Sequence, residues 1–552
     1  MNKTHIRLRL GLAAMLTSAS MISAIAADKK IIHDAEYYIV EAQNGKKWSV
    51  EDGELDKKLA ELKAKHGTTP NIIYILWDDM AYGDAGIPEL NKIRGFDTPS
   101  CNRMAEEGIA FTRMYSEPSC TPTRSAFITG RQPFRNGMYI PGFPVEFGGL
   151  AAEEVTIGEI LSKAGYATAF FGKSHLGDIE ESYMHNQGFD EALFTPYNQV
   201  LSLWNPMGEG ANAVMGVMKD QFPKNPYQLD NDFAPRGWIL NIEGKKGEKA
   251  KEWGTISHDD YLKMDPECEK RTVAFIRKNA KAKKPFFVCY WPQMTSFIAN
   301  PKKNTQGRAL LGEGFEKVDA FIGQVMDELN ELGIADNTLL VGMADNGPMV
   351  HNPPPGLGMT ETIFTGGKGD HTEGGVRVPA FAWWPGVIKP NQVVGDIIQV
   401  TDLFTTFARI GGGTSYIPTD RVIDGIDQTA LLLNGDTKGR RDYVHIYKGL
   451  ELSATVKAKY KQDWTVVIPG MVTVSYFDLQ NDIREKNPLE VPLLHFNSAF
   501  VRMKERHEKQ IEQYPNKPQA KGPAFTGISN ARPETQSLEA LYYSSHPHIK
   551  KK

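Results

Sequence analysis

Four short apolar runs in this chain each end directly in a group of polar side chains. The runs are residues 72–77, 167–171, 286–291 and 339–344. They lead into Asp78-Asp79, Gly172-Lys173-Ser174-His175, residues 292–296, and Asp345-Asn346. Helix-like patterns lie between them, so strands alternating with helices predict an α/β domain around a largely parallel sheet. Because ligands bind beyond the carboxyl ends of parallel strands, we expect the four polar groups to converge.

Two of these groups together form a candidate metal site. Asp78, Asp79, Asp345 and Asn346 supply three carboxylates and one amide oxygen, with no imidazole or thiolate among them. Such hard oxygen ligands suit Ca²⁺ or Mg²⁺ rather than zinc. Three carboxylates packed without a cation would also repel one another and raise each other's pKa. Taken separately, each pair is equally typical of a helix cap or a turn.

The segment 118–131, PSCTPTRSAFITGR, is the most informative stretch of the chain. Pro122 fits the first turn of a helix, which places Cys120 at the N-terminus of that helix. Free N–H groups and the helix dipole favour an anion there. Arg124, about one turn further on, would reach both Cys120 and a metal-bound oxygen. A lone cysteine is otherwise more often a small buried apolar residue.

This segment resembles the active-site motif of the sulfatases, of the type whose cysteine is converted after synthesis to formylglycine. The pattern C-x-P-x-R followed by T-G is present as Cys120, Pro122, Arg124, Thr129 and Gly130. A second sulfatase motif, G-Y-x-T followed by G-K-W-H-L-G, matches residues 165–177, with Ser174 in place of its tryptophan. The further matches are Asp78-Asp79, 345–347, 366–369 and 373–379, so the resemblance spans residues 70 to about 430.

The resemblance implies a fold, a cofactor and a nucleophile. The fold is that of alkaline phosphatase and the sulfatases, a large mixed sheet flanked by helices with a smaller C-terminal α+β domain. One Ca²⁺, rather than Mg²⁺, would be held by Asp78, Asp79, Asp345 and Asn346 together with Cys120 in its 3-oxoalanine (formylglycine) form. One hydroxyl of the hydrated formylglycine would attack sulfur, and the second would expel sulfate.

The resemblance also implies roles for the remaining polar residues. Arg124 and Lys173 would offset charge around the diol and the metal, while Lys173 and Lys368 would bind sulfate oxygens. His175 would hydrogen-bond the diol and help to remove its proton. Taken singly, either lysine is more typical of a solvated surface charge.

One position departs from the family pattern. Ser296 stands where many sulfatases carry a histidine that protonates the leaving oxygen, and serine is a poor general acid at neutral pH. Ser296 and His351 are candidate substrate-binding residues, and His351 and His371 are candidates to replace the missing acid. Either histidine is also compatible with a plain surface or packing role.

The first 27 residues have the pattern of a secretory signal. Lys3, Arg7 and Arg9 precede an apolar stretch, 10–27, that ends in small residues suited to cleavage before Asp28. The alternative, an uncleaved membrane anchor, needs about 20 apolar residues, whereas this run contains hydroxyl side chains. We therefore predict export to the bacterial periplasm or secretion, with no stable membrane anchor after signal removal. Four cysteines are too few for a disulfide scaffold.

The rest of the chain divides into two predicted domains. Residues 28–440 would form the catalytic α/β domain, containing an irregular segment, 198–254, that is typical of a lid or substrate loop. Residues 441–552 would form the smaller domain. A separate amphipathic helix is predicted over 51–65, bounded by Gly67. The net charge of −4 gives no basic footprint for nucleic acid, which is excluded as a partner.

The sequence therefore predicts an arylsulfatase-like enzyme that hydrolyses sulfate monoesters of small molecules or saccharides. Its other expected partner is the maturation enzyme that generates formylglycine. Two alternatives stay open. The first is a phosphonate or phosphate ester hydrolase of the same superfamily, because the same nucleophile and metal can attack phosphorus. The second is a catalytically silent oxyanion-binding homologue in which Cys120 never matures.

Overall fold

The computed structural model describes residues 30–94, 97–142, 146–197, 241–254, 258–293, 308–350, 363–465, 475–489 and 494–549. The predicted signal peptide (1–27), Ser296, His351 and most of the predicted irregular segment lie outside these residues. All statements below concern the described part of the chain.

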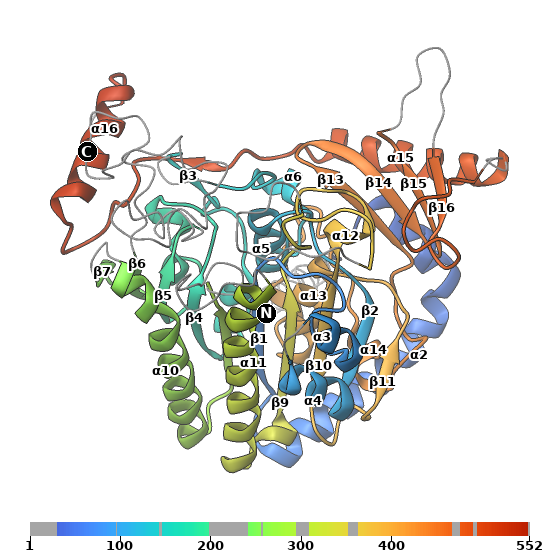
Figure 1. The fold of residues 1–552 in the computed structure, drawn as a ribbon, viewed down its shortest axis with the longest axis horizontal. Coiled ribbons are helices and arrows are strands. Elements are labelled where there is room, and N and C mark those ends of the chain that lie inside the picture. Colours follow the sequence, from blue (N-terminus) through green and yellow to red (C-terminus); the bar gives the residue numbers. More distant parts are fainter. Residues whose placement is uncertain are drawn as a thin grey trace, which may run out of the picture.

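A large mixed sheet runs through the main body of the molecule (Figure 1). Its strands are β1 (Asn71–Trp77), β2 (Ile109–Tyr115), β4 (Ala167–Lys173), β5 (Glu191–Thr195), β6 (Asn241–Lys245), β7 (Lys251–Trp253), β8 (Phe286–Trp291), β9 (Thr338–Ala344), β10 (Arg377–Trp383), β11 (Gln392–Val394) and β12 (Ile398–Gln399). The order is β11-β2-β10-β9-β1-β8-β4-β5-β6-β7, with β12 also paired to β2. Its centre, β9-β1-β8-β4-β5, is parallel, while β10 and β6 pair antiparallel with its two ends.

The central strands are buried on both faces, which is why they read as uninterrupted apolar runs. Every residue of β1, β4, β8 and β9 is buried. Register is continuous across them: Ile72 lies opposite Phe287 on one side and Leu339 on the other. Helices cover both faces of the sheet and complete the core.

The helices are α2 (Ala35–His66), α3 (Pro88–Arg94), α4 (Pro99–Glu107), α5 (Cys120–Thr129), α6 (Pro133–Asn136), α7 (Ile157–Lys163), α10 (His258–Ala282), α11 (Arg308–Glu331), α12 (Glu373–Val376), α13 (Val400–Ile410), α14 (Thr429–Asn434), α15 (Leu494–Gln513) and α16 (Pro533–Ser545). In Figure 1, α4, α10 and α11 lie in front of the sheet, whereas α5 and α13 lie behind it. None of the helices in these ranges is both long enough and apolar enough to cross a membrane.

A second, smaller sheet lies at the upper right of Figure 1. It is antiparallel throughout and consists of β13 (Tyr443–Lys448), β14 (Glu451–Lys457), β15 (Tyr460–Asp463) and β16 (Ser475–Asp478). Helix α15 packs beside this sheet and against α2. After α15 the chain returns to the main body, where β17 (Ala520–Lys521) pairs with β3 (Gly148–Gly149).

These features confirm the predicted fold class, a large mixed α/β sheet with a smaller C-terminal sheet. The domain boundary at residue 440 stays a prediction. The structure differs from expectation in two places. Helix α2 begins at Ala35 instead of residue 51. The described end of the segment expected to be irregular forms β6 and β7, because backbone groups at the sheet edge pair with β5 and with each other.

Candidate active site

Three of the four polar groups at the strand ends converge, as the sequence predicts, while most of the fourth (292–296) lies outside the described residues. Asp78 and Asp79 follow β1, and Asp345 and Asn346 follow β9, its direct neighbour in the sheet. The last paired residues are Trp77 and Ala344, so the two acidic segments leave the sheet at the same level. Lys173 is the last residue of β4, on the other side of β8. The parallel pairing therefore brings all three segments to one edge.

Helix α5 adds the cysteine. The helix begins at Cys120, after an extended Ser119, and ends at Gly130 in the left-handed region (φ 66°). Cys120 is buried. Its Sγ, one carboxylate oxygen of Asp78 and one carboxylate oxygen of Asp345 all lie within 4.8 Å of one another. The prediction that Cys120 stands at a helix N-terminus is confirmed.

The Arg124 side chain holds these groups in place. Its Nη2 donates to Asp345 Oδ2 at 2.8 Å and to Asp78 Oδ1 at 3.2 Å, and its Nη1 donates to the Lys173 carbonyl at 2.7 Å. The guanidinium also lies 5.1 Å from the centre of the Trp291 ring, at the end of β8. The sequence analysis missed Trp291 as a site residue, although it is the last residue of the apolar run that points into the site.

Two lysines complete the ring of charges. Lys173 Nζ donates to Asp78 Oδ1 at 2.6 Å, and Lys368 Nζ donates to Asp79 Oδ1 at 2.7 Å. The Lys368 loop is fixed to the cysteine segment, because the amide of Gly369 donates to the Pro118 carbonyl at 2.7 Å. Lys173 is fully buried, whereas 18% of the Lys368 side chain is exposed. Of the two lysines, Lys368 is therefore the one whose ammonium group is accessible to solvent and to an incoming anion.

The pKa values of the Asp78 and Asp345 carboxyls are shifted in opposite directions. Burial raises the pKa of Asp345 well above its ordinary value, and the charge of Asp78 raises it further. Burial acts in the same direction on Asp78, but Lys173, Lys368 and Arg124 together hold the pKa of Asp78 well below its ordinary value. A bound divalent cation favours the ionised form of both.

The oxygen atoms of the site fit such a cation. Asp79 Oδ2 and Asn346 Oδ1 are buried and find no hydrogen-bond partner among the described residues. Buried polar atoms of this kind are rare without an ion, a water or a functional reason. Asp79 also adopts a left-handed backbone (φ 47°), which is uncommon for a residue with a side chain. These unpaired atoms support a hard cation.

The predicted repulsion among the carboxylates is present, since the charge of Asp78 raises the pKa of Asp345. Ion pairs with Arg124, Lys173 and Lys368 offset part of this repulsion. The lysines come from segments far apart in the chain, so the sequence alone could not show which carboxylates they would pair with. The case for the cation therefore depends both on the unpaired oxygens and on the raised pKa of Asp345.

His175 lies beside this ring with one ring nitrogen free. Its Nε2 lies 2.9 Å from the Gly142 carbonyl and therefore carries the hydrogen, while Nδ1 is buried without a partner among the described residues. Burial lowers the pKa of His175 well below its ordinary value, and the nearby Lys173 charge lowers it further. The imidazole is thus neutral at neutral pH, with an unprotonated Nδ1 that can accept a hydrogen bond.

His371, one candidate for the missing acid, pairs with the smaller sheet. Its Nε2 lies 3.0 Å from Asp463 Oδ2, at the end of β15, and its own carbonyl accepts from Lys461 Nζ at 2.7 Å. It stands three residues after Lys368 in the same loop. The other two candidates named for this part of the site, Ser296 and His351, lie outside the described residues.

Comparison with known proteins gives consistent matches. The family model described as Sulfatase matches residues 70–413. The chain is 31% identical to the steryl-sulfatase of Rattus norvegicus over 443 residues, which is 71% of this chain and 75% of that protein. It is 32% identical to the N-acetylgalactosamine-6-sulfatase of Homo sapiens over 411 residues, 72% of each.

Among solved structures, the PsFucS1 sulfatase from Pseudoalteromonas sp. superposes with a TM-score of 0.73 at 28% identity. That match covers 85% of this chain and 96% of the other. A phosphonate monoester hydrolase from Silicibacter pomeroyi shares the fold, with a TM-score of 0.51 at 16% identity over 81% of this chain and 96% of the other.

Proposed function

Because this chain belongs to the sulfatase family and is a sulfuric ester hydrolase, we propose that it cleaves sulfate monoesters with a formylglycine made from Cys120 and a bound Ca²⁺. The observation that carries the proposal is the juxtaposition of the Cys120 Sγ with carboxylate oxygens of Asp78 and Asp345 at the start of α5. Five segments of chain supply this one cluster of charges.

Asp78, Asp79, Asp345 and Asn346 would hold the calcium ion. They offer only oxygen ligands, and two of these oxygens are buried without a partner among the described residues. Calcium bound there supplies a fixed positive charge next to residue 120. Arg124 keeps Asp78 and Asp345 at the separation that two ligands of one ion need, because its Nη2 donates to both.

The lysines would bind the anionic half of the substrate. With a cation on the carboxylates, Lys173 and Lys368 can turn their ammonium groups from Asp78 and Asp79 to sulfate oxygens. Lys368 would make the first contact, because it is the partly exposed one. Together they would stabilise the charge that develops on those oxygens as the ester bond breaks.

His175 would act as the base of the site. Its unpaired Nδ1 is unprotonated at neutral pH, and the negative charge of a bound sulfate would raise its lowered pKa, so that it could take a proton from the side chain of residue 120. The Gly142 carbonyl fixes the tautomer by accepting from Nε2 at 2.9 Å. Histidines that serve as bases need such an orienting partner.

We propose small-molecule or saccharide sulfate esters as substrates, with aryl sulfates as the first to test. Aryl leaving groups need little protonation, so they avoid dependence on an acid at the position of Ser296. A paired assay with an aryl sulfate and the matching aryl phosphate separates this proposal from a phosphate ester hydrolase. We expect the sulfate to be turned over faster, and a clear preference for the phosphate would contradict the proposal.

Mass spectrometry of the tryptic peptide 114–124 from active material tests the nucleophile. We expect this peptide to lack a thiol that can be alkylated and to react with a hydrazide, as an aldehyde does. Cys120→Ala should abolish turnover with the fold intact by circular dichroism. An unmodified thiol in fully active enzyme, or an active Cys120→Ala variant, would show that the nucleophile is wrongly assigned. Inactive protein with a plain thiol would instead indicate the silent oxyanion-binding alternative.

We also propose that the protein is exported after cleavage before Asp28, on the strength of the N-terminal sequence pattern alone. N-terminal sequencing of the mature protein from the producing bacterium should begin at Asp28. A mature protein that retains Met1 would contradict this.

A further inference from the structure

A second cluster of potential ligands lies away from the active-site strands. It consists of Asp34 at the N-terminus of α2, His445 on β13 and His507 on α15. One ligand atom of each lies within 4.8 Å of the other two, and all three side chains are buried. Asp34 and His507 are 473 positions apart in the chain.

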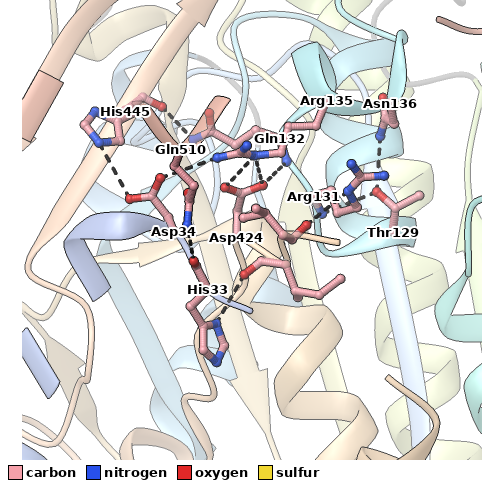
Figure 2. Close-up of polar contacts among 12 residues, drawn as sticks. His33, Asp34, Thr129, Arg131, Gln132, Arg135, Asn136, Asp424, His445 and Gln510 are labelled. Carbon is pink, nitrogen blue, oxygen red and sulfur yellow. Dashed lines mark hydrogen bonds and ion pairs between the residues drawn. The ribbon is translucent and has the colours of Figure 1, made fainter. Parts of the chain in front are cut away.

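The ring nitrogens are arranged as in histidines that bind a metal. His445 Nδ1 lies 3.1 Å from the Thr455 hydroxyl, and His507 Nε2 lies 2.6 Å from the Tyr447 hydroxyl. The other nitrogen of each ring faces Asp34: His507 Nδ1 is 2.5 Å from Oδ1, and His445 Nε2 is 3.9 Å from Oδ2. Figure 2 shows His445 and Asp34 facing each other. Metal-ligating histidines characteristically have their second nitrogen fixed by such a partner.

Two buried polar atoms in this cluster are unpaired. His445 Nε2 and the Tyr443 hydroxyl have no hydrogen-bond partner among the described residues. The 3.9 Å separation from Asp34 is too long for a hydrogen bond. Tyr443 stands two residues before His445, so both side chains point to the same face of β13. An unsatisfied buried polar atom destabilises a fold, and a ligand here would remove that penalty.

We propose that Asp34, His445 and His507 bind a divalent transition-metal ion, and that this ion is zinc. Two imidazoles and one carboxylate suit zinc and differ from the oxygen-only set of the active site. The Tyr443 hydroxyl or a water would take the fourth position. Coordination requires His507 Nδ1 and Asp34 Oδ1 to move apart to roughly 3.4 Å, since each ligand atom lies about 2.0–2.2 Å from a tetrahedral zinc.

The neighbouring arginine does not prevent this. Arg135 Nη2 lies 3.4 Å from Asp34 Oδ1, but its Nε donates to both oxygens of Asp424 at 3.0 and 3.1 Å (Figure 2). The charge of Arg135 is therefore compensated, and the arginine orients Asp34. The metal would join the start of the long N-terminal helix to the smaller sheet and to α15.

Metal analysis of the untagged full chain tests the site. After dialysis against a calcium buffer, inductively coupled plasma mass spectrometry should find about one zinc per chain in the wild type. His445→Ala and His507→Ala should each lower zinc at least tenfold. Two matched controls should keep it: His185→Ala, which removes a buried histidine elsewhere, and Asp345→Asn, which alters the calcium site.

A spectroscopic measurement covers variants that fold poorly. Cobalt added to metal-depleted wild-type protein should give the visible absorption bands of a tetrahedral site with nitrogen ligands, and Asp34→Asn should weaken them. Zinc should also raise the Tm of the depleted wild type but not of His445→Gln. Wild-type protein that carries no transition metal as purified and binds none on addition would overturn the proposal and leave a purely hydrogen-bonded cluster. The active-site proposal is unaffected by either result.

Discussion

The Arg124 side chain contacts several groups of the candidate active site at once. It donates to two carboxylates and one carbonyl, and it packs over the Trp291 ring. A lysine has a single nitrogen on a flexible stem and cannot reproduce this planar set of donors. We therefore regard Arg124 as the residue that sets the separation of Asp78 and Asp345.

Arg124→Lys should lower kcat/KM for an aryl sulfate by roughly 10²-fold or more, because the two carboxylates lose their common donor. Arg131→Lys is the matched control, since Arg131 is also buried and lies seven residues further along, but pairs with Glu154. Steady-state kinetics with Tm values check this. Both variants should lose stability, and equal kinetic losses would show that the effect of Arg124 is only structural.

Lys368→Ala should lower kcat/KM by about 10²–10³-fold, because the variant removes the charge that we propose binds the sulfate oxygens. The side chain is partly exposed, so the Tm should change by only a few degrees. Lys270→Ala, at an exposed position of α10, serves as the control and should leave both values unchanged. Unaltered kinetics in Lys368→Ala would remove this residue from the site.

Glu117 should make stability depend on pH. Burial raises the pKa of this carboxyl to about 8, although Gln399 Nε2 donates to it at 3.1 Å. The folded state therefore holds a proton that the unfolded state loses near pH 4.5. The free energy of unfolding should fall as pH rises from about 4.5 to 8, by at most roughly 1.4 kcal/mol per pH unit.

Glu117→Gln should flatten that dependence, because an amide keeps the contact with Gln399 and does not ionise. Urea unfolding at pH 5, 6, 7 and 8 measures it. Glu106→Gln, at an exposed position, should behave as the wild type. Parallel pH profiles for Glu117→Gln and the wild type would contradict the protonated state of Glu117.

Among the helices and strands, those that carry the site were the most predictable. The central strands are apolar runs with a polar end, and α5 has a proline in its first turn and a glycine cap. Helix α2 was predicted only from residue 51, whereas it begins at Ala35 and continues through Asn44-Gly45. In the structure Asn44 Nδ2 instead donates to the Val40 carbonyl within the helix, and Asp34 caps its start.

The close contact between β4 and β8 gives a prediction for Gly172. A Cβ there would lie 1.9 Å from the Trp291 carbonyl oxygen, and the backbone has a φ of +115°. Gly172→Ala should therefore destabilise the protein by several kcal/mol, since β4 must shift and Lys173 with it. Gly165→Ala is the matched control, because its φ is +94° but no atom lies within 4 Å of the added carbon.

Gly165→Ala should destabilise by about 1–2 kcal/mol, which is the strain of the backbone alone. Denaturant unfolding of both variants gives the comparison. The prediction for Gly172 fails if the two substitutions destabilise the protein equally.

In the whole molecule, the sequence predicted the sheet and its active edge but not the path of the last residues. The chain leaves α15 and returns to the main body, where Arg532 and Thr535 both contact Glu252 on β7. Strand β17 has only two residues, which is too short for a periodic sequence pattern to predict it. The pairing of His371 with Asp463 could not be predicted either, because it joins a loop of the large domain to the smaller sheet and the two residues lie far apart in the chain.

The burial of Cys120 sets an order of events for a newly made chain. A processing enzyme cannot reach a side chain that is 1% exposed, so the oxidation that we propose for Cys120 would have to precede folding of this region. The amide that closes over the cysteine segment belongs to Gly369, about 250 residues further along the chain. Synthesis at roughly 5–20 residues per second delivers that amide only after on the order of tens of seconds. While the chain between Cys120 and Gly369 is being synthesised, the thiol of Cys120 stays accessible.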